Sequence, residues 1–111
     1  MKNIVELLNI NALENKNDLA LQDEDGFLTY GELFDLVLQR ASFIKDLGLV
    51  NSPIIVKVNR SKESIVNFLA VLLSNNHYIP VDEDIPLEKL NKIIKASKAE
   101  YVLPICKIDN L

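Results

Sequence analysis

The sequence contains a single cysteine, no tryptophan and only three glycines among its 111 residues. Because Cys106 is alone, an internal disulfide and a zinc site built from cysteines are both excluded. This cysteine content fits a reducing compartment, so we expect a cytoplasmic protein. The glycines, Gly26, Gly31 and Gly48, lie far apart. No glycine-rich loop whose backbone amides hold a phosphate is therefore present in this sequence.

Basic residues are also scarce, since 12 lysines and arginines stand against 16 acidic residues and give a net charge of -4. Only Arg40 and Arg60 are arginines, so we expect no nucleic-acid partner. The longest apolar run, residues 68–73, is far shorter than the roughly 20 residues needed to cross a bilayer. Glu6 interrupts the apolar start, so we expect no signal peptide. We expect one globular domain, residues 1–111, with no membrane partner.

The clearest local signal is a helix that begins after Thr29. Thr29 and Glu32 have the spacing of a capping box, and Leu28 and Leu33 that of a hydrophobic staple. One apolar face follows at helical spacing: Tyr30, Leu33, Phe34, Val37, Ala41 and Ile44. Gly48 supplies the left-handed residue that ends the helix.

Three further helices are expected. A short one covers residues 4–8. Ser61 caps another over residues 62–74, which is apolar nearly all round and ends at Asn75 and Asn76. Pro86 opens the last, to residue 96. Its inward face is expected to be Leu87, Leu90, Ile93 and Ile94.

Strands are expected between these helices, at residues 19–25, 52–58, 78–81 and 99–105. The β-branched run at 54–56 is typical of a strand that is buried on both faces. Pro80 removes a ladder donor, so its strand should be short, bulged or near an edge. The alternation of strands and helices predicts an α/β fold: a doubly wound, mainly parallel sheet with flanking helices. Nothing after the strand at Tyr101 is expected to extend the sheet.

Three consecutive acids, Asp82, Glu83 and Asp84, follow one of these strands. Together with Asp23 and Asp25 they could hold magnesium beside a phosphorylatable Asp82, as in phospho-receiver domains. That chemistry also needs a hydroxyl residue on a fourth strand and a lysine on a fifth, and the sequence offers neither. A solvated turn is the favoured interpretation, and the receiver stays a remote alternative.

His77 and Cys106 could formally pair as a base and a thiol nucleophile. Simpler roles are a turn residue for His77 and a small hydrophobe for Cys106. The larger aromatic side chains are expected in the core: Tyr30, Phe34, Phe43 and Phe68.

Two motifs, "LTYGEL" at residues 28–33 and "LSNNHYIPVDEDIP" at 73–86, resemble conserved motifs of adenylate-forming (AMP-binding) enzymes. The Tyr-Ile-Pro-Val-Asp sequence is similar to the amino-acid-activating branch. That branch includes D-alanine–D-alanyl carrier protein ligases and nonribosomal peptide synthetase adenylation domains. Asn75, Asn76 and His77 depart from the small residues that the family has before this motif.

The resemblance implies the amino-terminal subdomain of such an enzyme, truncated before the site. In the family, ATP and magnesium are held by a later Ser/Thr/Gly-rich loop, an acidic residue and a distant lysine. None of these motifs occurs in this sequence, so we assign no catalytic, cofactor-binding or metal residue. The turn at Asp82 is then structural, leading from a strand into a helix.

The function that the resemblance implies is that of a ligase fragment. Intact relatives convert an amino acid and ATP into an aminoacyl adenylate and pass it to a carrier protein. This chain alone is expected to be inactive and to need no cofactor. Its expected partner is the remainder of an adenylation enzyme or a carrier protein. The alternative is a stand-alone protein-binding module that pairs with a separately encoded adenylation or assembly-line protein.

Overall fold

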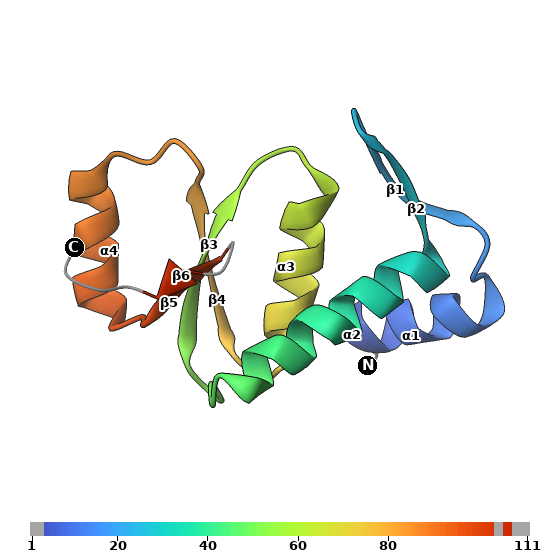
Figure 1. The fold of residues 1–111 in the computed structure, drawn as a ribbon, viewed down its shortest axis with the longest axis horizontal. Helices are drawn as coiled ribbons and strands as arrows, with labels where there is room; N and C mark the ends of the chain where they lie inside the picture. The colour runs from blue at the N-terminus through green and yellow to red at the C-terminus, as the bar shows by residue number, and fades with distance from the viewer. Residues whose placement is uncertain (1–3, 104–105, 108–111) are drawn as a thin grey trace.

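The computed structural model describes residues 4–103 and 106–107 (Figure 1). Along the chain the helices are α1 (Ile4–Glu14), α2 (Tyr30–Asp46), α3 (Lys62–Leu73) and α4 (Leu87–Ser97). The strands are β1 (Leu19–Asp23), β2 (Gly26–Thr29), β3 (Pro53–Val58), β4 (His77–Asp82), β5 (Tyr101–Leu103) and β6 (Cys106–Lys107). None of the helices in this described part is long and apolar enough to cross a membrane.

The main sheet has the strand order β4-β3-β5-β6. β3 pairs in parallel with both β4 and β5, and β6 returns antiparallel to β5. The α/β expectation is confirmed. Pro80 does lie in an outer strand of this sheet, and the β3–β4 register runs without a bulge. The expectation that nothing extends the sheet after Tyr101 was wrong, because β6 does so.

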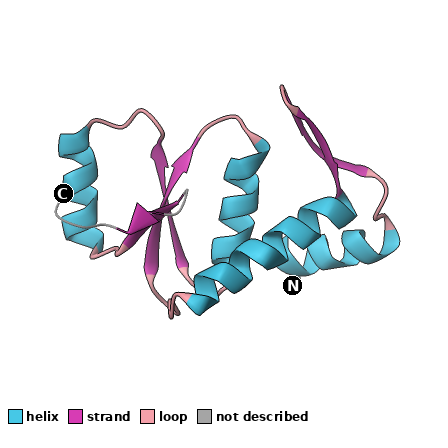
Figure 2. Cartoon of the chain, in the orientation of Figure 1, coloured by secondary structure: helices cyan, strands magenta, loops and turns pink. Residues whose placement is uncertain are grey.

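Helices cover both faces of this sheet (Figure 2). On one face, Ile54 and Val56 of β3 pack with α2 and α3 through side chains such as Ile44 and Val71. On the other face, Ile55 packs against α4. Successive side chains of β3 therefore point to opposite faces of the sheet and pack into two separate cores, as expected for a strand that is buried on both faces. A third core joins α1, α2 and α3: Leu8, Leu33, Val37, Val66 and Leu69.

β1 and β2 form a separate antiparallel hairpin that stands at the end of the molecule away from α4 (Figure 1). The sequence predicted the strand at 19–25 but placed it in the parallel sheet and missed β2. The segment "GFLT" has only four residues and leads directly into the capped helix, so it is too short to show a strand pattern in the sequence. Asp23 and Asp25 thus sit at a hairpin tip and not at the carboxyl end of a parallel strand.

The α2 prediction holds in detail. Thr29 Oγ1 accepts a hydrogen bond from the Glu32 amide at 3.3 Å, and Glu32 Oε1 accepts one from the Thr29 amide at 2.9 Å. Gly48 follows the helix with φ +80°. The apolar face is buried at Leu33, Val37, Ala41 and Ile44, and half-buried at Tyr30 and Phe34.

Other helix details differ from expectation. α1 extends well beyond residue 8, to Glu14. Ser61 precedes α3, yet its side chain makes no cap hydrogen bond. In α4, Leu90 is buried and Ile93 and Ile94 are half-buried, as expected. Leu87 was expected to face inward and is 60% exposed, since it occupies the first position of the helix, before the turn that contacts the sheet.

The turn between α3 and β4 uses its asparagines for different tasks. Asn75 adopts φ +61°, the left-handed conformation that asparagine tolerates. Asn76 is buried, and its amide nitrogen donates to the Leu49 carbonyl at 3.2 Å while its oxygen accepts from the Ser52 amide at 2.9 Å. Asn76 therefore ties this turn to the loop between α2 and β3.

Candidate functional site

The place in this sheet where ligands commonly bind is the crevice beyond the carboxyl ends of β3 and β4. The helix that follows β3 lies on one face of the sheet and the helix that follows β4 lies on the other. In open α/β sheets such a reversal of direction leaves a crevice between the two strand ends. Here it is formed by residues 59–61 after β3 and residues 83–85 after β4.

Several polar groups of this crevice bond to one another. Asn59 Nδ2 donates to Glu83 Oε2 at 2.8 Å, and the Glu83 amide donates to the Val58 carbonyl at 3.2 Å. Asn59 Oδ1 also accepts from the Ser61 amide at 2.8 Å and from Ser64 Oγ at 3.0 Å. The Asn59–Glu83 bond therefore bridges the crevice.

The acidic loop after β4 is a turn. Asp82, Glu83 and Asp84 are exposed, and the Ile85 amide donates to the Asp82 carbonyl at 3.0 Å. Across the described ranges, 4–103 and 106–107, no group of three or more His, Cys, Asp or Glu side chains could hold a metal ion. The receiver alternative was wrong, because Asp23 and Asp25 belong to the hairpin and not to a strand beside β4.

Asp23 instead joins the hairpin tip to the start of α3. Its Oδ2 accepts a hydrogen bond from the Lys62 amide at 2.8 Å, and its Oδ1 lies 2.5 Å from Lys62 Nζ. Oδ1 also accepts the Asp25 amide at 2.9 Å. Only 10% of the Asp23 side chain and 17% of the Lys62 side chain are exposed, so this ion pair is well shielded from water.

These contacts change the acidity of Asp23. The hydrogen bond from the Lys62 ammonium, followed by that from the Lys62 amide, lowers the pKa of Asp23 from 3.8 to about 2. Partial burial opposes this change, because it disfavours the charged carboxylate. The carboxylate form is thus favoured by its fixed donors.

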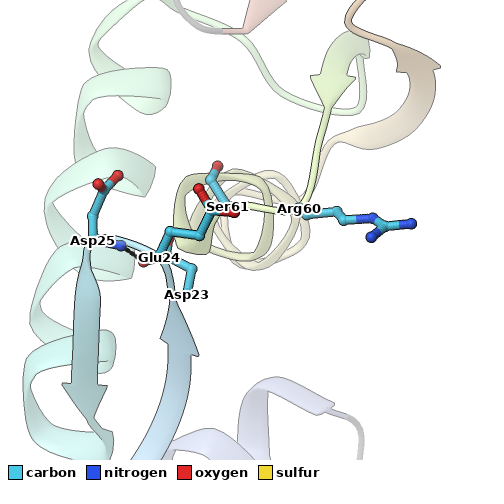
Figure 3. Close-up of a pocket in the computed structure, with 5 residues that line it drawn as sticks. All are labelled: Asp23, Glu24, Asp25, Arg60 and Ser61. Carbon is cyan, nitrogen blue, oxygen red and sulfur yellow. Dashed lines mark hydrogen bonds between the residues drawn. The ribbon is translucent and has the colours of Figure 1, made fainter.

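A shallow pocket of about 350 Å³ lies beside this contact (Figure 3). It is lined by Asp23, Glu24, Asp25, Arg60 and Ser61. In Figure 3 the Arg60 side chain points away from the three acids. Most of the charge that faces the pocket is therefore negative.

The residues present do not fit a nucleoside triphosphate. The amino end of α3 would suit a phosphate, but its Lys62 amide already binds the Asp23 carboxylate. Gly26 begins β2 and Gly48 lies in the turn after α2, whereas Gly31 lies inside α2, with its Cβ position 3.2 Å from the Lys16 carbonyl oxygen. No phosphate cradle is assembled by the described chain.

The structure separates the remaining candidate residues. His77 is exposed at the start of β4, and Cys106 belongs to β6. β3 and β5 lie between these two strands, so the sheet does not bring this pair together. The Cys106 side chain lies outside the described residues.

The aromatic residues divide between core and surface. Tyr30, Phe34 and Phe68 pack against the core shared by α1, α2 and α3. Phe43 was expected in the core but is 47% exposed, because it lies outside the buried stripe of α2 that ends with Ala41 and Ile44. Tyr78, from the second motif, meets Phe68 edge to face with ring centres 4.7 Å apart, and burial raises the pKa of Tyr78.

Sequence reasoning missed Lys62 as the partner of Asp23. No local pattern could reveal this pair, because 39 positions separate the two residues. The bond network of Asn59 had a weak local signal in the sequence "NRSKES", since asparagine and serine side chains often bond to nearby backbone amides.

The chain matches the AMP-binding enzyme family over residues 8–110. It is 38% identical over 101 residues to a D-alanine–D-alanyl carrier protein ligase of Bacillus licheniformis, covering 90% of this chain and 20% of the ligase. It is 33% identical to surfactin synthase subunit 1 of Bacillus subtilis over 111 residues, covering 99% of this chain and 3% of that subunit. The chain therefore spans a fifth or less of the length of these relatives.

Among solved structures, the fold is similar to the amino-terminal subdomain of NpsA from Klebsiella oxytoca, a structure determined in complex with anthranilyl-AMSN. The TM-score is 0.83 with 20% identity, and the match covers 92% of this chain and 27% of that one. At this identity the likeness shows the shared fold. Together with the family match, it shows that the chain belongs to the AMP-binding enzyme family and resembles the amino-terminal part of adenylate-forming ligases.

Proposed function

We propose that the chain serves as the amino-terminal subdomain of an amino-acid-activating, adenylate-forming ligase in the cytoplasm. In the complete reaction an amino acid and ATP give an aminoacyl adenylate and pyrophosphate. The aminoacyl group then passes to the thiol of a carrier protein, and AMP leaves. The observation that carries this proposal is the 38% identity to a D-alanine–D-alanyl carrier protein ligase over 90% of this chain.

The contribution of this subdomain is structural, and the chain by itself is inactive. Support comes from the amino end of α3, where Asp23 takes the Lys62 amide that a phosphate would use. The bridged crevice between Asn59 and Glu83 supports the same view. ATP and magnesium are bound by the remainder of the ligase, and this chain needs no cofactor of its own.

The partner is therefore the polypeptide that makes up the rest of an adenylation domain. An apolar groove of about 260 Å³, between α1, the hairpin and α3, supports such an interface. Ile4, Leu7 and Ile65 on its rim are each more than 40% exposed. Exposed apolar side chains gathered in one groove are typical of a surface that another polypeptide covers.

A complementation assay tests this proposal. The Bacillus licheniformis ligase, deleted for the segment that matches this chain, is mixed with the chain and assayed for D-alanine-dependent exchange of pyrophosphate into ATP. We expect neither part to support exchange alone and the mixture to restore it. Exchange by the chain alone would contradict the proposal.

Matched variants locate the interface. Leu7→Ser with Ile65→Ser removes apolar surface from the groove, whereas Leu13→Ser with Val50→Ser removes it from exposed positions elsewhere. We expect only the first pair to reduce the restored exchange. A stable complex between the two parts that shows no exchange would instead favour a stand-alone binding module.

A further inference from the structure

α4 carries a regular set of lysines on its outer surface. Lys89, Lys92 and Lys95 recur every three residues in the helix, and Lys98 follows as its left-handed C-cap. All four are exposed. They make up a third of the 12 basic residues of a chain whose net charge is -4, and the helix carries a single acid, Glu88, so positive charge is concentrated on it. We refer to these four residues as the α4 lysine face.

Interactions within the chain do not account for this face. The two ion pairs found within residues 4–103 join Arg40 to Glu63 and Lys62 to Asp23, and neither involves α4. Lys95 lies in the last turn, where a cation interacts favourably with the helix dipole. Lys89 is the third residue of the helix, where the dipole disfavours a cation. Helix stability therefore gives no reason for a lysine at position 89.

The opposite side of α4 is already used. Leu90, Ile93 and Ile94 pack with Ile55 and other side chains of the sheet. The apolar face of this helix is thus not free to enter a bilayer, as a membrane-surface helix requires. What the helix offers a partner is its charged side, at the end of the molecule away from the hairpin and the apolar groove (Figure 1).

We infer that the α4 lysine face is a docking surface for an acidic surface on another protein. Flexible lysines suit a carboxylate-rich partner, because each ammonium can meet a carboxylate without fixed geometry. The face has no arginine and no aromatic side chain, the residue types that read or stack nucleic-acid bases. The inference goes beyond the proposed function, because it concerns α4 and not the apolar groove of the proposed interface.

The test uses the full chain and fluorescein-labelled poly-L-glutamate as the acidic probe, with binding followed by fluorescence anisotropy at low ionic strength. One variant carries Lys89→Gln and Lys92→Gln. Its control carries Lys16→Gln and Lys45→Gln, which remove the same charge from exposed positions on other helices and loops. Circular dichroism confirms that both variants are folded.

We expect the α4 variant to bind about fivefold more weakly than the unmodified chain, and the control to bind within about twofold of it. Added salt should abolish the difference, because the contacts are exposed. Equal losses in both variants would overturn the inference, as would an unmodified chain that does not bind the probe. Tighter binding to duplex DNA or to phosphatidylglycerol vesicles than to poly-L-glutamate would also overturn it.

Discussion

The first backbone amides of α2 and α3 are hydrogen-bonded by different kinds of groups. Each helix has a hydroxyl residue immediately before it, Thr29 for α2 and Ser61 for α3. Thr29 caps its own helix, and Glu32 completes the box within four residues. Ser61 makes no cap bond, and the α3 amide of Lys62 is bound by Asp23 from the hairpin.

The α2 cap is a local interaction within one segment, whereas the α3 contact connects two parts of the fold. A capping box stabilises a helix wherever the helix lies. The Asp23 contact stabilises α3 only while the hairpin is in place, and it also fixes the hairpin. A two-stranded hairpin is marginal by itself, so an anchor at its tip has a clear structural purpose.

Among substitutions at the two helix starts, replacing Asp23 by alanine should reduce the stability of the protein most. The change removes the cap of α3, the partner of the shielded Lys62 ammonium and the anchor of the hairpin. We expect a larger fall in the midpoint of thermal unfolding than any substitution at the α2 cap produces. Glu24→Ala, at the exposed neighbouring position, is the control and should leave the midpoint nearly unchanged. An Asp23→Ala protein as stable as this control would show that the contact does not hold the hairpin.

Acid should weaken the same contact without any mutation. The pKa of Asp23 is lowered from 3.8 to about 2 in the folded protein, so the stability it provides is complete above pH 3.8. That stability is lost as the pH falls through about 2. Urea unfolding followed between pH 5 and pH 2 should show a smaller loss in Asp23→Asn than in the unmodified chain. Parallel curves for the two proteins would contradict the assignment.

Thr29→Ala should have an intermediate effect, confined to α2. Loss of this cap should reduce the free energy of unfolding by about 1 kcal/mol. Urea denaturation measures the change, and Thr29→Ser is the control that keeps the hydroxyl acceptor. A loss in Thr29→Ser as large as in Thr29→Ala would show that the methyl group, and not the cap, matters.

Ser61→Ala should have the smallest effect, although its place before a helix makes it look like a cap. Asn59 Oδ1 keeps its bonds from the Ser61 amide and Ser64 Oγ after the hydroxyl is removed. We expect a change of about 0.5 kcal/mol or less in the free energy of unfolding. A loss equal to that of Thr29→Ala would mean that the hydroxyl caps α3 in solution.

The same contrast explains what the sequence could predict. α2 was predicted with its cap, its buried stripe and its terminal glycine, because all three signals lie within the segment itself. The strand around Ile55 was predicted from its β-branched run. The Asp23–Lys62 contact could not be predicted, because it depends on how the hairpin folds back onto α3. Phe43 was misplaced because it was assigned to the core as a large aromatic side chain, although it lies outside the predicted helical stripe.

The candidate site was predicted mainly through the family motifs. They indicated that the turn at Asp82 is structural, and the exposed acids and the Asn59–Glu83 bridge agree with that. The departures at Asn75 and Asn76 were harder to interpret. In the structure Asn75 forms a left-handed turn, and the buried Asn76 side chain hydrogen-bonds to Leu49 and Ser52.

Titration calorimetry of the chain with magnesium and ATP tests the central claim most directly. The account predicts no heat of binding, because Asp23 takes the α3 amide and no glycine-rich loop is present to hold the phosphates. A saturable isotherm with a micromolar Kd would contradict it.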